Sequence, residues 1–317
     1  MKRCVFSSFL KWKEKKVRQP LVLMGARQVG KTWLMRDFGK RNFARVHEFN
    51  FDGSADLASV FVNTKKPDEL LRKLSIIGGV KINPAEDLVI FDEIQECADA
   101  LNALKYFNED CPQLAVMAAG SLLGVKLGSR KNAVGAKLPS SYPVGKVELL
   151  DVEPMTFGEY LREKDAALYD FWSSVSGNEP LDDIFHHHLL DAYDEYMIVG
   201  GMPEVVNTFI KAGNFADVHR EQNKIMNDYK DDMSKYAATP DKPKIRACYE
   251  AIPRQLASET KKFQYATVQK GANSKKYRHS IDWLKDANLV HCCCNVSTPQ
   301  FPFAAYEKPE QFKLYIS

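Results

Sequence analysis

The chain has 317 residues, of which 45% are hydrophobic and 27% are charged; these values are typical of globular proteins and exclude a disordered or fibrous class. No apolar run approaches the ~20 residues that cross a membrane, so we expect no membrane contact and a cytoplasmic location. The seven cysteines contain no C-x-x-C pair, and we expect them to be reduced thiols. The net charge of +3 conceals two basic segments: residues 1–18 carry seven Lys/Arg and one Glu (net +6), and residues 242–285 carry eleven Lys/Arg and three acidic residues (net +8).

The first predicted elements are a strand, a glycine loop and a helix. The apolar run Leu21–Met24 stops at Gly25, and a helical pattern begins at Lys31. Continuous apolar runs are typical of parallel strands buried on both faces, and the stretches between the runs are long enough for crossover helices. We therefore predict a doubly wound α/β domain over residues 1–152. The further predicted strands are Val46–Phe51, Leu88–Phe91, Leu114–Ala119 and Val147–Leu150.

Helical periodicity replaces the strand signals after Pro154 and predicts a helical module over residues 153–240. After Pro240 the pattern becomes helix, helix, strand with many basic side chains, which predicts a winged-helix-like module over residues 241–317. The predicted helices are Phe157–Lys164, His186–Ile198, Val218–Tyr236, Ile245–Ser258 and Ser274–Lys285, and the predicted strand is Leu289–Val296.

Two runs of metal-ligating residue types do not predict metal sites. Cys292, Cys293 and Cys294 lie in a predicted strand, where neighbouring side chains point to opposite faces and the three thiols cannot converge on one ion. Residues 186–188 are histidines, but helical metal ligands need i, i+4 spacing to share a face. We expect small strand residues and a solvated helix face, respectively.

Residues 25–32 read GARQVGKT and satisfy the pattern G-x-x-x-x-G-K-[ST]. In this pattern glycines let successive backbone N–H groups surround phosphates, and the following helix adds its positive end. We expect Lys31 to contact the β- and γ-phosphates of ATP and the Thr32 hydroxyl to bind Mg²⁺; the alternative is a tight turn without a ligand. The predicted nucleotide-binding residues of the loop are Gly25, Ala26, Arg27, Gln28, Val29, Gly30, Lys31 and Thr32.

Two predicted strands lead to polar residues at the edge where open α/β sheets place their ligands. The run Leu88–Phe91 is followed by Asp92 and Glu93. We expect Asp92 to hold Mg²⁺ and Glu93 to orient and polarise the water that attacks the γ-phosphate. The next strand leads to Ser121, which either contacts the γ-phosphate or the water as a further catalytic residue or serves packing alone. The predicted catalytic residues are thus Lys31, Glu93 and Ser121.

With these motifs the chain resembles the AAA+-like ATPases of the archaeal-ATPase group, specifically bacterial members that carry a C-terminal domain of unknown function. The resemblance implies an AAA+-type core, a helical lid and a winged-helix module. It also implies adenine contact by the Gly-x-Pro of the lid, here Gly201 to Pro203; the alternative is a simple helix break. The matching stretches are PLVLMGARQVGKT (20–32), VIFDEIQ (89–95), GSLLG (120–124), SYPVGKVE (141–148), PMTFGEYL (154–161), GGMPEV (200–205), IPRQL (252–256) and YRHSIDWLKDANLV (277–290).

The sequence departs from that group in three places. Residues 125–140 are longer than the usual connection, and Lys146 stands where many relatives have an arginine. No arginine finger is therefore assigned, and Arg130 is a candidate. Similar proteins continue into a restriction-endonuclease-like domain, whereas this chain stops at Ser317, so we expect a truncated product or a fragment.

The leading hypothesis is Mg²⁺-dependent ATP hydrolysis with nucleotide-driven movement of the lid. The competing hypothesis is a slow or non-hydrolysing ATP-dependent switch that binds a protein or DNA partner, and a small-molecule kinase is a third. Residues 242–300 are expected to contact DNA weakly and without sequence preference. The alternatives for this region are docking of a protein partner or self-association.

Overall fold

The computed structural model describes residues 1–120, 145–176 and 180–317, which form two compact units. The first contains the described residues up to Ile225, and the second contains those from Met226 onward. The predicted α/β region and most of the predicted helical module therefore share one unit. None of the helices in these residues combines the length and apolarity that a membrane crossing requires.

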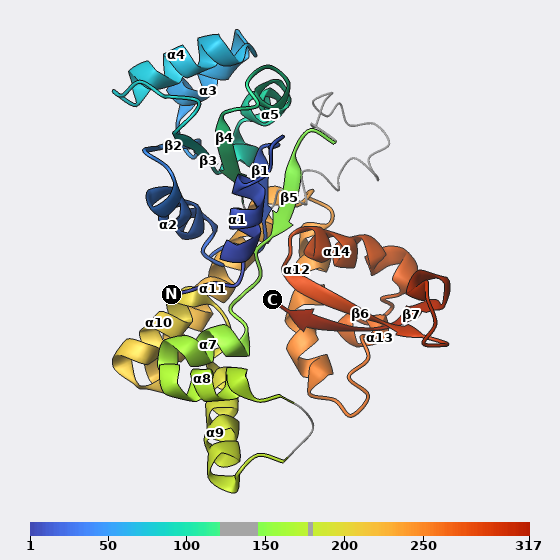
Figure 1. Ribbon diagram of the computed structural model, residues 1–317. Coiled ribbons are helices and arrows are strands. Elements are labelled where there is room, and N and C mark those ends of the chain that lie inside the picture. The colour runs from blue at the N-terminus through green and yellow to red at the C-terminus, as the bar shows by residue number, and fades with distance from the viewer. Residues whose placement is uncertain (121–144, 177–179) are drawn as a thin grey trace. The chain divides into compact units, whose positions relative to one another are not determined.

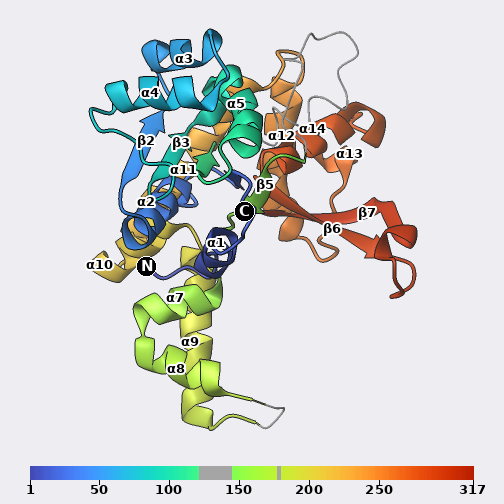
Figure 2. The ribbon, with the colours of Figure 1, turned by 45° about the horizontal axis from the view of Figure 1, so that its top comes forward.

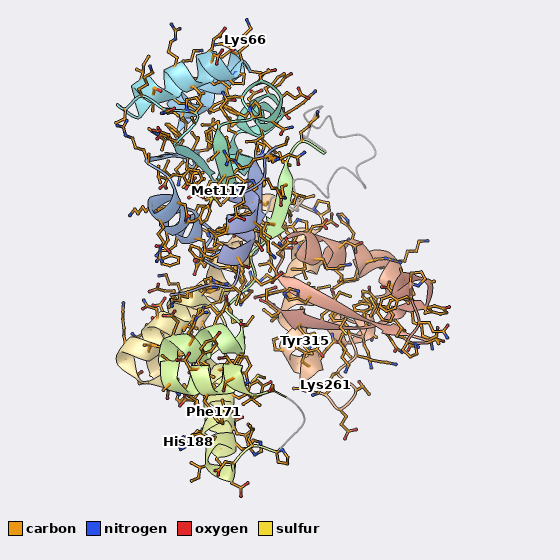
Figure 3. All side chains as sticks on the ribbon, viewed as in Figure 1. Lys66, Met117, Phe171, His188, Lys261 and Tyr315 are labelled. Carbon is orange, nitrogen blue, oxygen red and sulfur yellow. The ribbon has the colours of Figure 1, made fainter. Side chains whose placement is uncertain are left out.

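A five-stranded parallel sheet with the order β2-β3-β4-β1-β5 forms the centre of the first unit (Figure 1). Both faces of β3 and β4 are buried, which explains their unbroken apolar sequences. Met117 of β4, for example, is fully buried in the interior of the unit (Figure 3). The strands are β1 (Leu21–Met24), β2 (Val46–Asn50), β3 (Leu88–Asp92), β4 (Ala115–Ala119) and β5 (Glu148–Asp151), so the predicted parallel sheet is confirmed.

One aromatic cluster attaches helices to this sheet, and a second joins two helices to each other. Phe91 of β3 packs against Phe61 of α3 and Phe107 of α5, while Phe9 of α1 packs against Phe38 of α2. Figure 2 shows α3, α4 and α5 gathered together, with α1 lying apart from them. The helices before β5 are α1 (Phe6–Lys13), α2 (Lys31–Asn42), α3 (Ala55–Val62), α4 (Pro67–Ile77) and α5 (Ala98–Asp110), with the short 3₁₀ helix η1 (Ile94–Glu96) after β3.

The chain after β5 is helical, as predicted. Thr156 and Glu159 form a capping box at the start of α7, and Leu161 packs with Leu189 in a small core. The three histidines of α9 are exposed, so the expectation of a solvated helix face is confirmed. The helices are α7 (Phe157–Lys164), α8 (Ala166–Ser174), α9 (Asp183–Val199), α10 (Pro203–Ala212) and α11 (Phe215–Tyr236).

The second unit combines helices with an antiparallel hairpin. Its core joins α12, α14 and β7 through buried side chains such as Ile245, Leu284 and Leu314. On β6 the burial alternates, and Cys292 and Cys294 share a face with their Sγ atoms 3.8 Å apart, whereas Cys293 is exposed. The elements are α12 (Lys242–Leu256), α13 (Tyr265–Val268), α14 (Ser274–Asp286), β6 (Val290–Val296), the 3₁₀ helix η2 (Phe303–Ala305) and β7 (Glu307–Ile316).

Candidate functional site

The glycine loop connects the end of β1 to the first residue of α2. Its curvature uses the left-handed region at Gly25, Gln28 and Gly30, whose φ values are 136°, 68° and 92°. A Cβ atom at Gly25 would lie 2.2 Å from the Val152 carbonyl oxygen, so this position has no room for a side chain. The loop and the N-terminus of α2 together have the form of an anion-binding site.

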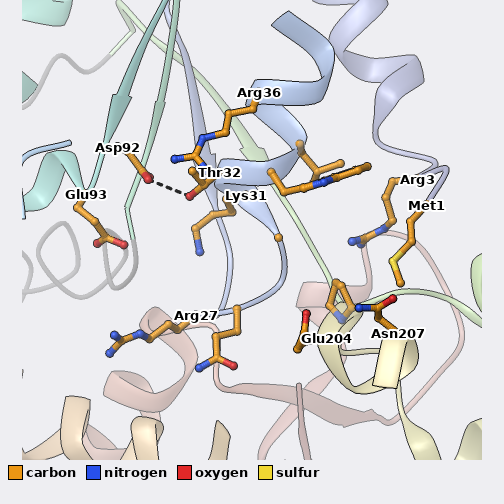
Figure 4. A pocket seen from close by; sticks show the side chains of 15 residues that line it. Met1, Arg3, Arg27, Lys31, Thr32, Arg36, Asp92, Glu93, Glu204 and Asn207 are labelled. Atoms are coloured by element: carbon orange, nitrogen blue, oxygen red, sulfur yellow. Dashed lines mark hydrogen bonds between the residues drawn. The ribbon is translucent and has the colours of Figure 1, made fainter. Parts of the chain in front are cut away.

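A cavity of about 650 Å³ opens beside this loop and α2, within the range of pockets that hold nucleotide-sized ligands. Figure 4 shows Lys31 between the loop and the two carboxylates, and Arg3, Glu204 and Asn207 at the other end of the cavity. The predicted residues that line the cavity are Arg27, Gln28, Gly30, Lys31, Thr32, Asp92, Glu93 and Pro203.

The ammonium group of Lys31 is held by the loop itself. Its Nζ atom donates to the carbonyl oxygens of Gly25 at 2.9 Å and Ala26 at 2.8 Å. The side chain is only 8% exposed, and this burial lowers the pKa of Lys31 to about 8. A desolvated cation of this kind gains strongly from a polyanion that replaces the two neutral carbonyls.

Thr32 and Asp92 are adjacent, although they are far apart in the sequence. The Thr32 hydroxyl donates to Asp92 Oδ2 at 2.9 Å, which joins the start of α2 to the end of β3 (Figure 4). Burial raises the pKa of the Asp92 carboxyl, the bond from Thr32 opposes this, and the neighbouring Glu93 charge adds to the increase. A buried carboxylate beside a hydroxyl fits the few protein oxygens that Mg²⁺ takes when it is also bound to phosphates.

Glu93 follows β3 in a left-handed conformation with a φ of 50°. Its side chain lines the cavity, and its Oε2 atom accepts a hydrogen bond from Nε2 of Gln95. Gln95 belongs to η1 and is only 5% exposed, so the donor is held by packing. The sequence analysis did not predict a role for Gln95. Its position two residues after Glu93 is the one feature of the sequence that could have indicated a contact with that carboxylate.

Pro203 and Gly201 have different surroundings. A Cβ atom at Gly30 would lie 3.7 Å from the Pro203 ring, so the first turn of α10 meets the glycine loop. Gly201 instead meets Met155: its carbonyl oxygen accepts from the Met155 N–H at 2.6 Å, and a Cβ atom there would lie 2.3 Å from the Met155 oxygen. Pro203 lines the cavity together with the loop, whereas Gly201 packs next to it.

Arg3 is a residue of the cavity that the sequence analysis did not predict. It lines the cavity, and its side chain is 5% exposed. Arg36, which follows Thr32 by one helical turn, also lines the cavity and forms an ion pair with Glu48 of β2. The predicted Ser121 and the candidate Arg130 lie outside the described residues.

The comparison with solved structures decides the type of fold. The Walker-type ATPase PABY2304 of Pyrococcus abyssi is 15% identical, the match covers 98% of this chain and 91% of that chain, and the TM-score is 0.55. The fold is therefore similar to that of this Walker-type ATPase. Residues 17–161 match the family described as AAA domain, in agreement with the AAA+-like resemblance of the loop and the Asp92–Glu93 motif.

Other matches add no detail to the site. Residues 190–317 match a family described as a domain of unknown function (DUF8612). The ORC1 protein of Aeropyrum pernix, solved in complex with DNA, is 12% identical, with coverage of 100% and 90% and a TM-score of 0.37. AMPPCP-bound DnaA from Aquifex aeolicus is 16% identical, with coverage of 89% and 86% and a TM-score of 0.37. The comparison with curated proteins gave no match.

Proposed function

We propose that the P-loop ATPase fold of this chain binds Mg-ATP and hydrolyses it to ADP and phosphate. The observation that carries the proposal is the convergence of a buried ammonium, a hydroxyl and two carboxylates on one cavity. Lys31 and Thr32 come from the start of α2, and Asp92 and Glu93 come from the end of β3. These are the charges that phosphoryl transfer from a nucleoside triphosphate requires.

Each side chain has a separate role in this proposal. Lys31 exchanges its two carbonyl acceptors for the β- and γ-phosphates. Thr32 and Asp92 would hold Mg²⁺, which neutralises phosphate charge when it is bound. Glu93 orients the attacking water and accepts its proton, with Gln95 fixing the direction of the carboxylate. Ser121 remains a predicted contact of the γ-phosphate.

We further propose that α10 senses the nucleotide and that the helical region after residue 153 acts as a lid. The proximity of Pro203 to the loop at Gly30 supports this role, because both residues line the cavity that would hold the nucleotide. Adenine contact is proposed for Pro203. Gly201 has an indirect role in this proposal: because it has no side chain, the main chain before Pro203 can lie close to Met155, and Gly201 itself does not contact the base.

The competing proposal is a slow or non-hydrolysing switch. It is favoured by one observation, namely that the bond from Gln95 occupies one carboxylate oxygen of Glu93, so that this oxygen is already engaged when a water molecule enters the cavity. In this case ATP would be retained, and the output would be a partner bound through the second unit. The helices α12 to α14 and the β6–β7 hairpin have the element order of a winged-helix-like module, and we propose weak contact with DNA by residues 242–300.

The deciding experiment is phosphate release by the purified protein, with and without DNA, for the parent and two variants. Glu93→Gln should retain Mg-ATP and lose hydrolysis, whereas Asp92→Asn should lose the Mg²⁺-dependent part of ATP binding. Glu96→Gln is the matched control, because Glu96 is exposed and does not line the cavity. Parental single-turnover rates for Glu93→Gln would exclude Glu93 as the residue that positions water, and ATP retention without turnover by the parent would favour the switch.

A further inference from the structure

Arg3 joins three segments that are far apart in the sequence. Its Nη1 atom donates to the Val29 carbonyl of the glycine loop at 3.2 Å, and Nη2 donates to the Glu153 carbonyl after β5 at 2.5 Å. Its Nε atom lies 3.2 Å from the carboxylate of Glu159 on α7. One guanidinium group therefore contacts the loop, the connection after the sheet and the first helix beyond it.

The bond to Val29 has a direct consequence for the loop. In a trans peptide unit the C=O and N–H bonds point in opposite directions across the planar group. The hydrogen bond that holds the Val29 carbonyl towards Arg3 therefore directs the Gly30 N–H away from Arg3. Gly30 itself has a φ of 92°, a conformation that glycine adopts at little cost but also leaves readily, so the direction of this N–H depends on an outside partner.

The guanidinium is held in place from the other side by Glu159. This carboxylate is 4% exposed and also accepts from the main-chain N–H groups of Cys4 at 2.5 Å and Thr156 at 2.9 Å. Two buried opposite charges with further hydrogen bonds are costly to separate, because either one alone would be left unpaired. Glu159 thus fixes both the side chain of Arg3 and the main chain that follows it.

The segment that carries Arg3 is anchored on both of its sides. Arg162 of α7 donates to the Lys2 carbonyl, while Phe6 and Phe9 of α1 pack edge-on against Phe38 of α2. The segment therefore has fixed contacts to the helix after the glycine loop and to the first helix after the sheet. Because its main chain is fixed on both sides, Arg3 is held beside the loop, unlike a mobile surface arginine that contacts a carbonyl only part of the time.

We propose that Arg3 is a positioning residue for the glycine loop, which it holds in the phosphate-binding conformation through Val29 and couples to α7 through Glu159. The inference rests on the proposed nucleotide binding, but it acts through the main chain and needs no contact between Arg3 and the nucleotide. Loss of the hydrogen bond from Arg3 to the Val29 carbonyl therefore increases the mobility of the loop even when no nucleotide is present.

The test combines amide hydrogen exchange of residues 25–32 without nucleotide with ATP affinity by calorimetry. Arg3→Lys keeps the charge beside Glu159 but replaces the planar fork with a single ammonium group, so we expect faster exchange in the loop and about tenfold weaker ATP binding. Arg18→Lys is the matched control, because Arg18 also donates to two carbonyls, those of Lys13 and Gln113, and neither belongs to the loop. The purification tag is placed at the C-terminus so that Arg3 keeps its surroundings.

A double variant separates positioning from general stability. Arg3→Gln alone leaves Glu159 buried without its partner and should lower the melting temperature. Adding Glu159→Gln removes the second charge and should recover much of that loss. Loop exchange should stay fast, because the shorter glutamine has one amide nitrogen in place of the two guanidinium nitrogens that donate to Val29 and Glu153.

The outcomes can be told apart. Unchanged loop exchange and ATP affinity in Arg3→Lys would overturn the inference, as would loop exchange that returns to the parental rate in the double variant. If amide exchange in the loop is faster in Arg3→Lys than in the parent but the parent binds no ATP, the role of Arg3 in positioning the loop would be supported and the proposed nucleotide binding would be refuted.

Discussion

At the scale of single residues, Lys31 makes the cavity sensitive to pH. In the free protein its pKa is about 8 because the ammonium is buried, whereas phosphate contacts favour the charged form and raise the pKa in the complex. ATP affinity should therefore be fully present below about pH 8 and fall as the pH rises above it, by up to about tenfold per pH unit until the pKa of the complex is reached. Calorimetry with Mg-ATP between about pH 7 and about pH 9.5 measures this slope.

Lys31→Ala is the control for that slope. The variant should bind ATP at least about tenfold more weakly, which corresponds to about 1.4 kcal/mol, and its remaining affinity should be independent of pH in the same range. An equal affinity for variant and parent, or an equal slope, would mean that Lys31 does not contact the phosphates.

Gln95 provides a second prediction at this scale. Gln95→Leu keeps the buried volume but removes the donor to Glu93, so the carboxylate should lose its fixed direction. Single-turnover hydrolysis should slow by about tenfold, as expected for a lost hydrogen bond to a charged group, while the Kd for Mg-ATP stays the same. Faster hydrolysis would instead identify the bond as an inhibitory contact, and a weaker Kd would point to a general defect of the site.

The sequence predicts site residues where the chemistry is tied to a local pattern. Lys31 and Thr32 are predicted from the loop motif, and Asp92 and Glu93 are predicted because an apolar strand ends in two carboxylates. The structure places all four beside one cavity, and their roles remain predictions. Arg3 was missed because its acceptors, Val29, Glu153 and Glu159, are distant in the sequence and two of them are main-chain oxygens. No spacing rule describes such contacts.

At the scale of elements, burial decided which predictions succeeded. The strands β1, β3 and β4 were found because their side chains are mostly apolar and largely buried and because glycine or polar residues follow them. The strands β2 and β5 contain more polar residues; β2 is buried only at alternate positions, and the residues of β5 are at most partly buried. The strand β7 was missed because its first half, from Glu307, is exposed and contains Pro309, which is typical of an edge or an irregular strand. The helix α1 was missed because it has only eight residues and no side chain caps its start.

The first turn of α10 gives a prediction at the same scale. Pro203→Ala removes ring atoms that face the loop at Gly30 but leaves the helix start intact, since proline at this position replaces an N–H that makes no intrahelical bond. We expect weaker ATP binding by up to about tenfold, from the loss of about two buried methylene groups. The affinity for inorganic triphosphate, which has no base, should change less. Equal losses of affinity for ATP and triphosphate in a competition assay would mean that residues 200–203 only interrupt the helix and do not contact the adenine.

At the scale of the whole molecule, the distribution of charge predicts how the second unit meets a polyanion. Lys275, Lys276 and Arg278 are exposed on α14, whereas Trp283 and Leu284 are buried, as expected of core residues. The exposed basic side chains of α14 therefore suit phosphate contacts, and affinity should fall steeply as salt increases. Asn273 caps α14 by accepting from the Lys276 N–H at 3.1 Å, so its carbonyl oxygen is already used within the helix start.

Fluorescence anisotropy with duplex DNA at several salt concentrations measures this dependence. Combining Lys275→Glu with Lys276→Glu should weaken binding on all sequences alike and reduce the log–log salt slope by about two. Lys81→Glu with Lys211→Glu changes the net charge equally at exposed positions of the first unit and should have little effect. Absence of binding at low salt would favour docking of a protein partner.

The helix α11 runs without interruption from Phe215 to Tyr236, across the division of the units between Ile225 and Met226. A protease can cut a helical backbone only after several residues have unfolded, because the hydrogen-bonded chain does not fit an extended active-site groove. Limited digestion should therefore spare this junction. Fragments that end at Ile225 would expose unpaired carbonyls of a severed helix, so a stable first unit for expression should extend to Tyr236, and a stable second unit should begin at Phe215.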